Sequence, residues 1–390
     1  MNALEQLRKV QSKLDPEQVI DALDRVLAPG REHPESPWRA RLAREHGVYS
    51  REVLERGTLE GLRGWTGQAL RSLRARELRE PCWAPPVTAV WLAGSIPTAS
   101  FHALLLPLLA GSTVCVKPAS HDALSAQLFL ESVRALAPEI ADAIIVGDNP
   151  EWLDTADAVV AHGSDETIAV IRARVPAQRI FVGHGHKLSL AVIGREVELD
   201  AAAQAAALDI ALYDGRGCLS PAYLLVLDQP RGRATLFARA LARALARLAS
   251  ELPRGHLTQS EQLALRELRA RAALRAGVEL EMSAQGTDWT VILEAAGSRP
   301  PPGLLRCVPV IPLADASELE RWCGELAPHL SSLGHAGWSQ PHAELTRAVA
   351  QGGGSRVCPL GRMQYPPLDW NHDGMSPLRS LLRLIGVEEA

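Results

Sequence analysis

Residues 87–119 read VTAVWLAGSIPTASFHALLLPLLAGSTVCVKPA, and the fold class follows from them. The stretch opens with a continuous apolar run over 87–93, which predicts a strand buried on both faces. An apolar helix over 99–110 and a second strand over 112–117 come next. The pattern then predicts a helix at 121–137, strands at 142–147 and 156–163, a helix at 164–174 and a strand at 179–183. Alternation at this spacing indicates a doubly wound parallel sheet with helices on both faces.

The chain on either side of this region has other patterns. Residues 1–85 are predicted to be mostly helical, with Leu7, Val10 and Leu14 at helical spacing. The run LSLAVIG at 188–194 is predicted to leave the first sheet, and a second β/α region follows it. Its expected strands cover 222–228, 278–283, 288–294 and 305–313, and its expected helices cover 200–213, 234–252, 260–276 and 316–326. A loop, QGGGSR, precedes a tail in which PLRSLLRLIG predicts a terminal helix.

The composition argues against several classes of protein. A formal net charge of -4 does not suit a dedicated nucleic-acid binder. Glycine, proline and histidine residues interrupt the apolar stretch from Ala89 to Val116, so no run long enough to span a membrane remains. The N-terminal residues lack the apolar core of a signal peptide. The six cysteines are scattered without a C-x-x-C pair, which predicts a reduced, cytoplasmic protein without disulfides or a cysteine zinc site.

Cys218 differs from the other cysteines in its sequence setting. It lies in GRGCLSP (215–221), between a predicted helix and a predicted strand. The small residues around the thiol leave room for a substrate carbonyl. Arg216 and a helix end would favour the thiolate, which is the nucleophilic form of cysteine. Taken alone, the pattern also fits a buried loop cysteine, whereas Cys115 and Cys307 lie inside apolar strands and are expected to belong to the core.

Two turns between a predicted strand and a predicted helix carry groups that suit a nucleotide. Lys117 closes one strand, and Gly163 and Ser164 follow another. Ligands of such sheets bind beyond the carboxyl ends of the strands, and helix N-termini offer free N–H groups to phosphate. His184 and His186 form an H-x-H pattern, but no third ligand follows at a useful spacing, so no metal site is expected.

Short motifs between residues 95 and 218 occur in a recognisable order. They are SIP (95–97), AGSTV (110–114), KPA (117–119), HGS (162–164) and GHK (185–187), followed by Cys218. They resemble, in the same order, Asn-x-Pro, Ala-Gly-Asn-Thr-Val, Lys-Pro-Ser/Ala-Glu, Thr-Gly-Ser and Gly-Gly-Lys of the aldehyde dehydrogenase superfamily. Within that superfamily, NHDG (371–374) resembles the fatty acyl-CoA reductases of bacterial bioluminescence. The resemblance implies an aldehyde-dehydrogenase-like α/β fold.

The resemblance also implies a role for individual residues. Cys218 falls where the catalytic nucleophile belongs, and Ser95 stands where an asparagine usually stabilises the oxyanion. His372 would act with Asp373 as a proton-handling pair or hold the active site in place. The cofactor would be bound by Lys117, Ser120, Gly163, Ser164, Gly185 and His186.

Two departures from the superfamily pattern bear on the reaction. Ser120 replaces a glutamate that binds the ribose hydroxyls of NAD and repels a 2′-phosphate, which favours NADPH. Gly183 replaces the glutamate base with which a hydrolytic dehydrogenase activates water. A thioester reductase needs no such base, because attack by water would only waste the acyl-enzyme.

The expected protein is therefore an NADPH-dependent reductase that converts an acyl-CoA thioester to an aldehyde through an acyl-Cys218 intermediate. Residues 1–195 would form a helical segment and the NADP-binding domain, 196–345 the catalytic domain, and 346–390 a segment returning to the cofactor domain or an oligomer interface. Alternatives are an acyl-phosphate reductase of the same fold and a non-redox acyl-transferase subunit. Expected partners are an acyl carrier protein or acyl transferase, and further copies of the chain in a homo-oligomer.

Overall fold

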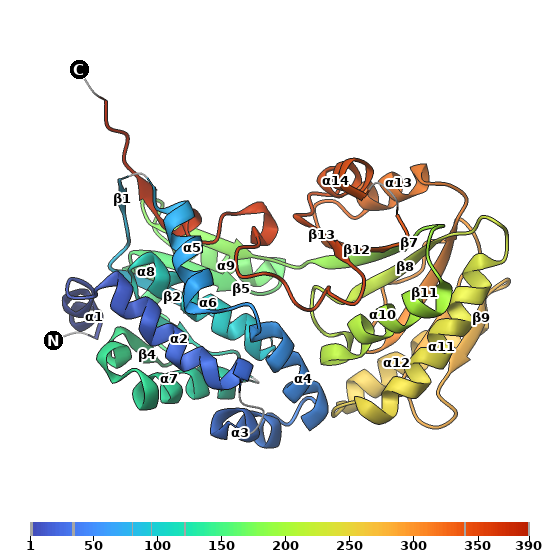
Figure 1. Cartoon of the computed structure of the whole chain (residues 1–390), viewed down its shortest axis with the longest axis horizontal. Coiled ribbons are helices and arrows are strands. Elements are labelled where there is room, and N and C mark those ends of the chain that lie inside the picture. Colours follow the sequence, from blue (N-terminus) through green and yellow to red (C-terminus); the bar gives the residue numbers. More distant parts are fainter. Residues whose placement is uncertain are drawn as a thin grey trace. The chain divides into compact units, whose positions relative to one another are not determined.

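A computed structural model describes residues 3–32, 36–79, 81–94, 96–120, 122–338 and 341–388. The chain forms two compact units, whose elements are labelled in Figure 1. The first unit comprises residues 1–46, 58–186 and 367–390, and the second comprises residues 47–57 and 187–366. The last part of the chain therefore returns to the unit in which the chain begins.

The first unit contains a five-stranded parallel sheet in the order β4-β3-β2-β5-β6. Its strands are β2 (Val87–Trp91), β3 (Thr113–Lys117), β4 (Ile144–Val146), β5 (Ala158–His162) and β6 (Ile180–His184). Every residue of the central strand β2 is buried, as expected of a strand covered on both faces. The parallel sheet predicted from the apolar run at 87–93 is confirmed.

Helices make up most of the rest of the first unit. They are α1 (Ala3–Gln11), α2 (Pro16–Glu32), α3 (Pro37–Glu45), α4 (Arg51–Leu62), α5 (Gly67–Glu77), α6 (Pro97–Ala110), α7 (Leu124–Leu136), α8 (Trp152–Thr155) and α9 (Asp165–Arg174), and α4 begins in the second unit. Leu4 and Leu7 of α1 pack against the sheet, but α1 ends before Leu14, contrary to the predicted spacing. Helix α6 ends at Gly111, whose φ of 96° gives the left-handed cap that glycine tolerates best.

The C-terminal segment differs from its prediction. The expected helix over PLRSLLRLIG is wrong, since the structure shows a 3-10 turn at Arg379–Leu381 and then strand β14 (Arg383–Leu384). Strand β14 pairs antiparallel with β1 (Cys82–Trp83). Leu381 is buried, but Leu384 and Ile385 are exposed. The apolar spacing of Leu378, Leu381, Leu382 and Ile385 fits a helix, but the backbone pairs with β1 instead, so tertiary pairing overrides the local pattern.

The second unit contains a seven-stranded sheet in the order β13-β12-β7-β8-β11-β10-β9. All neighbours are parallel except β9 and β10 at one edge. The strands are β7 (Leu188–Ile193), β8 (Pro221–Leu227), β9 (Glu279–Met282), β10 (Thr290–Leu293), β11 (Cys307–Leu313), β12 (Leu330–Ala336) and β13 (Arg356–Pro359). As predicted, LSLAVIG leaves the first sheet, because it forms β7 of the second.

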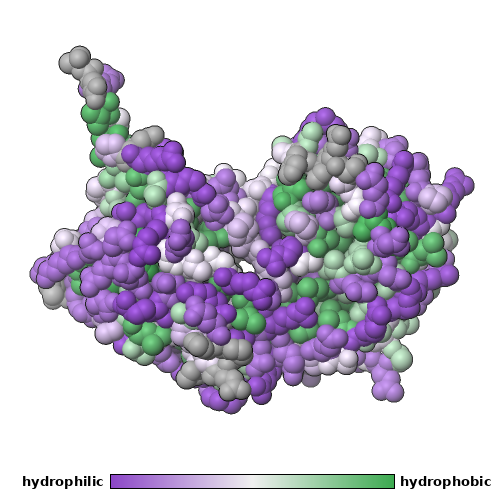
Figure 2. Space-filling model, viewed as in Figure 1, coloured by the Kyte–Doolittle hydropathy of each residue, from purple (hydrophilic) through white to green (hydrophobic). Residues whose placement is uncertain are grey.

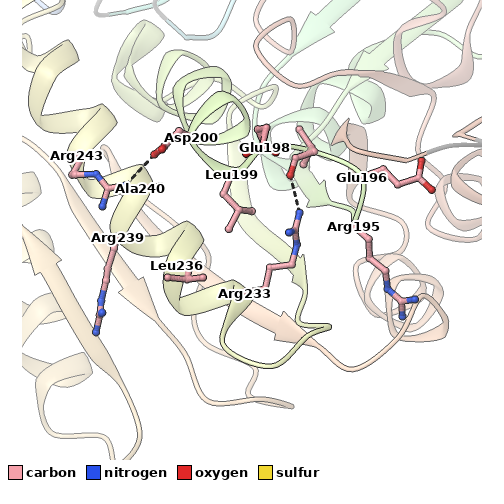
Figure 3. A pocket seen from close by; sticks show the side chains of 11 residues that line it. Arg195, Glu196, Glu198, Leu199, Asp200, Arg233, Leu236, Arg239, Ala240 and Arg243 are labelled. Atoms are coloured by element: carbon pink, nitrogen blue, oxygen red, sulfur yellow. Dashed lines mark hydrogen bonds and ion pairs between the residues drawn. The ribbon is translucent and has the colours of Figure 1, made fainter.

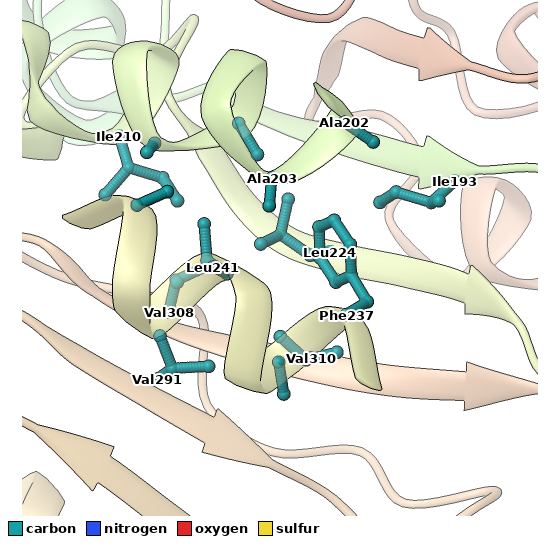
Figure 4. Close-up of a cluster of buried hydrophobic side chains, with 14 of the residues drawn as sticks. Ile193, Ala202, Ala203, Ile210, Leu224, Phe237, Leu241, Val291, Val308 and Val310 are labelled. Carbon is teal, nitrogen blue, oxygen red and sulfur yellow. The ribbon is translucent and has the colours of Figure 1, made fainter. Parts of the chain in front are cut away.

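Two pairs of helices bury apolar residues of this sheet in separate clusters. Helices α10 (Leu199–Ala211) and α11 (Arg233–Glu251) contribute Ala203 and Phe237 to one cluster, in which they meet Leu224 of β8 (Figure 4). Helices α13 (Ser317–Glu325) and α14 (Pro341–Gln351) contribute Trp322 and Leu345 to the other. Helix α12 (Gln259–Ala273) belongs to a smaller cluster with β10 and β11.

Some elements were not predicted or were misplaced. Three elements were not predicted from the sequence: β12, α14 and β13. The β12 sequence, LSSLGHA, has no continuous apolar run, although its serines are buried. The helix expected from residue 121 begins at Leu124, and residues 142–143 end a 3-10 helix, Pro138–Ala143, rather than starting a strand. The chain between β4 and β5 contains the helical turn α8.

Ala89 to Val116, the stretch with the most apolar sequence, folds into β2, α6 and β3. Among the described residues, no helix has both the length and the apolar character needed to cross a membrane. The face shown in Figure 2 is largely hydrophilic, with hydrophobic residues in small separate patches.

Candidate active site

Cys218 lies in a turn of the second unit, directly before the buried strand β8. The chain reaches it from α10 through a tight segment in which Tyr213 and Asp214 have positive φ angles of 51° and 55°. The buried Asp214 carboxylate forms a 2.6 Å ion pair with Arg306, which is also buried. Left-handed backbone is unfavourable for such residues, so this ion pair and the surrounding core hold the turn in its shape.

The thiol of Cys218 is the only exposed one among the six cysteines, all of which are described. The hydroxyl of Ser189, on β7, donates a 2.6 Å hydrogen bond to the backbone carbonyl of Cys218. Cys82 is half-buried. The other four thiols are buried, and burial raises the pKa to about 12 for Cys115 and Cys323 and to about 11 for Cys307 and Cys358. Of the six, Cys218 is thus the thiol that an external carbonyl reaches most directly.

Arg216, the cation expected from the sequence to favour the Cys218 thiolate, has other partners in the structure. The guanidinium of Arg216 is paired with Glu261 and donates to the carbonyl of His256 at 3.1 Å, so its charge is already compensated. Arg356, the first residue of β13, is buried, and burial lowers the pKa of its guanidinium. The negative charges of neighbouring groups, Cys218 among them, oppose that shift. Cys358 and Asp209 contribute more to this opposing effect than Cys218 does.

Arg356 is itself held by a loop that contacts the turn of Cys218. Its guanidinium donates to the carbonyls of Met363 at 2.7 Å and Arg362 at 2.8 Å. In the same loop, the Gln364 amide donates to the Ser220 hydroxyl at 2.7 Å. Ser220 lies two residues after Cys218, so this loop fixes both Arg356 and the turn of Cys218.

Asp209, near the end of α10, anchors that loop. Its carboxylate accepts hydrogen bonds from the backbone N–H groups of Gly361 at 2.5 Å and Met363 at 3.0 Å. Burial raises the pKa of Asp209 to about 7, although these two hydrogen bonds oppose the shift. Nothing in the local sequence marks a residue whose partner lies up to 155 residues away. The sequence therefore did not predict the roles of Asp209, Gln364, Ser189 and Arg356.

The residues expected to bind a cofactor all lie in the first unit, after strands of its sheet. Lys117 ends β3, and its ammonium donates to the carbonyl of Pro118 at 3.4 Å. Ser120 is exposed three residues later. Strand β2 separates β3 from β5 in the sheet, so Lys117 and Ser120 form a group apart from the other expected residues. Ser95, the expected oxyanion donor, lies outside the described residues.

The other four expected residues gather after β5 and β6, which are neighbours. Ser164 caps helix α9 by accepting from the N–H of Thr167 at 3.3 Å. The N–H of His186 donates to the Asp165 carboxylate at 2.8 Å. A Cβ at Gly185 would lie 2.3 Å from the same carboxylate, so a larger residue here requires the Asp165 side chain to shift. The helix end expected to receive phosphate thus already carries the carboxylate of Asp165, with Glu166 beside it.

Gly183, where a hydrolytic base would stand, is crowded by side chains. Its φ lies outside the left-handed region, so its backbone does not require glycine. A Cβ at this position would lie 2.8 Å from Phe181 and 2.9 Å from Ile168. A larger side chain here must displace these neighbours, and no carboxylate follows until Glu196.

His372 lies in a stack of aromatic rings at the carboxyl edge of the five-stranded sheet. His162 ends β5 and pairs in register with His184, which ends β6; their rings stack with centroids 4.7 Å apart. The ring of His372 stacks on that of His184 at 4.2 Å, and Trp370 lies 4.6 Å from His372. Asp373 makes a 2.8 Å contact with Nδ1 of His184. His372 and Asp373 are thus brought together with β5 and β6.

These rings line a small cavity of about 40 Å³, together with His102 of α6. Burial lowers the pKa of His162 well below its ordinary value and lowers that of His102 to about 4, with neighbouring histidines acting in the same sense. Both imidazoles are therefore neutral near pH 7.

A second hollow, in the second unit, is lined by other kinds of residues (Figure 3). Its volume is about 800 Å³, and charged residues of α11 and of the segment before α10 line it. Arg233 donates to the carbonyls of Gly194 and Val197, and Arg243 pairs with Asp200 at 2.9 Å. No residue expected to be catalytic or to bind a cofactor lines this hollow.

Comparison with known proteins identifies the family. The chain matches the family model of the acyl-CoA reductases (LuxC) over residues 39–384. It belongs to this family. The LuxC-family resemblance noted for NHDG is thereby confirmed for most of the chain, although the match by itself assigns no role to a residue.

Two curated relatives show how far the similarity extends. The chain is 26% identical over 309 residues to the long-chain acyl-protein thioester reductase of Aliivibrio fischeri. It is 24% identical over 308 residues to the long-chain acyl-protein thioester reductase 2 of Photobacterium leiognathi. Each match covers 76% of this LuxC-family chain and 63% of the relative, so the chain spans less than two thirds of the relatives' length.

Solved structures confirm the fold class. The aldehyde dehydrogenase PutA from Anabaena variabilis superposes with a TM-score of 0.73 at 17% identity, covering 98% of this chain and 90% of the other. Aldehyde dehydrogenase 21 from Physcomitrella patens superposes with a TM-score of 0.76 at 13% identity, covering 98% and 88%. The LuxC-family chain therefore has the aldehyde-dehydrogenase-like α/β fold that its ordered motifs predicted.

Proposed function

We propose that this protein reduces an acyl thioester to an aldehyde with NADPH, through an acyl intermediate on Cys218. The observation that carries the proposal is the exposed Cys218 thiol, which lies where the ordered motifs put the nucleophile, while four other thiols are buried. The names of its relatives, long-chain acyl-protein thioester reductases, support a long acyl chain and a protein-bound donor.

The first step uses Cys218 and the residues that hold its turn in the second unit. The Cys218 thiolate attacks the carbonyl carbon of the thioester, the bond to the donor sulfur breaks, and the donor leaves as a thiol after taking a proton. Arg356 favours the ionised form of Cys218, which is the form that attacks. Ser189 and Gln364 hold the turn, so that the thiol keeps one position during the attack.

The donor groups of the first unit fit a phosphate-bearing dinucleotide. The Lys117 ammonium has three N–H donors, and its weak contact with Pro118 leaves donors for a ribose or a phosphate. The exposed Ser120 hydroxyl offers a 2′-phosphate a hydrogen bond and no charge repulsion. A structural neighbour, glyceraldehyde-3-phosphate dehydrogenase GapN from Methanocaldococcus jannaschii, is complexed with NADP. When bound, the cofactor supplies the hydride that converts the acyl group to the aldehyde and returns Cys218 to its thiolate.

The proposal is tested by following NADPH oxidation and aldehyde formation with a chain-length series of acyl-CoA and acyl-carrier-protein thioesters. We expect one aldehyde for each NADPH oxidised, with long chains preferred. Oxidation with acyl phosphates but not with thioesters would show an acyl-phosphate reductase instead. Transfer of the acyl group to Cys218 without any NADPH oxidation would show a non-redox transferase.

A further inference from the structure

Four of the protein's 12 histidines meet at one place in the first unit. His162 and His184 end neighbouring strands, and His102 lies on α6. His372 comes from a 3-10 turn of the C-terminal segment, next to Asp373. They line the cavity of about 40 Å³ described above, which has room for a few waters at most. Such a concentration of imidazoles beside a buried carboxylate is the composition of a transition-metal site.

The candidate ligand atoms are close to the spacing that a metal ion needs. One oxygen of Asp373 lies 2.8 Å from Nδ1 of His184 and 3.8 Å from Nε2 of His372. The three candidate ligand atoms all lie within 4.8 Å of one another. In a tetrahedral zinc site, ligand atoms about 2.0–2.1 Å from the ion lie roughly 3.3 Å apart. The rings of His184 and His372 stack nearly parallel, with 12° between their planes, and an imidazole binds an ion close to its own ring plane. One of the two rings must therefore turn out of the stack to bring all three atoms around one ion.

A second observation points to a ligand at the same place. Nε2 of His162 is buried and has no hydrogen-bond partner among the described residues. A buried, unsatisfied imidazole nitrogen is unfavourable, and its ring stacks directly on that of His184. An ion with a bound water in the cavity would supply the missing partner, because the water can accept or donate a hydrogen bond there.

We propose that His184, His372 and Asp373 bind a divalent transition-metal ion, with Zn²⁺ the best match to two imidazoles and one carboxylate. Three protein ligands leave a fourth position for water, as in sites that are not purely structural. From the sequence, no metal site was expected at the H-x-H pattern of His184 and His186, because no third ligand follows at a useful spacing. In the structure His186 lies outside this set, and the other two ligands come from the C-terminal segment, with Asp373 189 residues beyond His184.

Binding is measured by titrating Zn²⁺ into the full-length, chelator-treated protein by calorimetry, without NADPH or thioester. The titration is done in a Cys218→Ala background, because an exposed thiol also binds zinc. We expect one ion per chain. His372→Gln and Asp373→Asn should each weaken binding by more than about 100-fold, since loss even of a group that only orients a ligand costs 10–100-fold. His256→Gln, at an exposed histidine of the second unit, is the matched control and should bind as the parent does.

Co²⁺ absorption gives a readout that does not depend on a variant folding. A spectrum of nitrogen and oxygen ligation, unchanged by Cys218→Ala, supports the site. A sulfur-to-metal charge-transfer band that disappears in Cys218→Ala, or zinc binding that is unaffected in the two ligand variants, would overturn it. Because the measurement contains neither cofactor nor substrate, either result leaves the proposed reductase function to be judged separately.

Discussion

Candidate functional residues lie at two places: where the strands of the five-stranded sheet end, here called the carboxyl edge, and where the strands of the seven-stranded sheet begin, here called the amino edge. The two edges are assembled differently. At the first edge, Lys117, His162 and His184 are each the last residue of a strand. At the second, Cys218 precedes β8, and its partners come from distant parts of the chain. Arg356, for example, opens β13, which two other strands separate from β8.

This difference has a consequence for how each edge responds to substitution. A residue that ends its own strand is positioned by local backbone, so its replacement should change mainly the contact that it makes. The turn of Cys218 depends on hydrogen bonds such as that from Gln364 to Ser220, 144 residues apart. Changes in those partners should therefore affect the position of Cys218 even when its own sequence is intact.

The largest effect is expected at the amino edge, from Cys218→Ala. Loss of the thiol removes the acyl intermediate, and reductase activity should fall by on the order of 10⁴-fold or more. The measurement is the rate of aldehyde formation at saturating NADPH. Cys82→Ala, at the half-buried cysteine of β1, is the control and should retain activity. Comparable losses in both variants would contradict the assignment of Cys218.

The next effect concerns the absence of a base at Gly183 on the carboxyl edge. A positioned base accelerates attack by water by on the order of 10²–10⁴-fold, and here Phe181 and Ile168 fill the space beside Gly183. The acyl-enzyme should therefore persist without NADPH, and aldehyde should greatly exceed free fatty acid when NADPH is present. Product ratios from the unmodified protein measure this. Fatty acid released as fast as aldehyde would show that another residue supplies the base.

Ser120→Glu should produce a smaller, local effect at the same edge. A carboxylate facing the 2′-phosphate should weaken NADPH use by about 1–3 kcal/mol, or roughly 5- to 150-fold, and shift preference toward NADH. The ratio of kcat/KM for the two cofactors measures the change. Ser250→Glu, at an exposed position of helix α11, should leave the ratio unchanged. A parent protein that already prefers NADH would refute this role for Ser120.

The loop that holds Arg356 is tested through Asp209→Asn. The Asn amide can accept only one of the two N–H groups from Gly361 and Met363, so unfolding free energy should drop by about 1–3 kcal/mol. Urea unfolding of the variant and the parent gives the difference. Asp200→Asn, on the same helix but exposed, is the control and should change little. Equal stabilities of the parent and the Asp209 variant would show that the carboxylate does not anchor the loop.

The same variant also gives a pH dependence. Burial raises the pKa of Asp209 to about 7 from 3.8, so the folded protein holds a proton there that the unfolded chain releases. Its contribution to stability is therefore fully present below pH 4 and is lost as the pH rises through 7. The advantage of the parent over Asp209→Asn should shrink between pH 5 and pH 8. An advantage that grows over this range would reverse the assigned sign.

The two edges also explain what could be predicted from the sequence. The apolar run at 87–93 and the order of the motifs were enough for the fold class, because buried parallel strands leave a strong local signal. The β12 sequence, LSSLGHA, has no such signal, and neither does the Asp209 anchor. The charge on Arg216 suggested activation of Cys218, but only the fold shows that Glu261 compensates it. His372 and Asp373 could be recognised as a motif, whereas their position beside His184 depends on tertiary structure.

The central claim, that Cys218 carries the acyl group, is tested most directly by intact-protein mass spectrometry after mixing the protein with acyl-CoA in the absence of NADPH. We predict a single acyl adduct that peptide mapping places on Cys218, that is absent from Cys218→Ala, and that disappears as aldehyde forms when NADPH is added. An adduct on Cys82 or Cys323, or aldehyde formation by Cys218→Ala at the parent rate, would contradict the account.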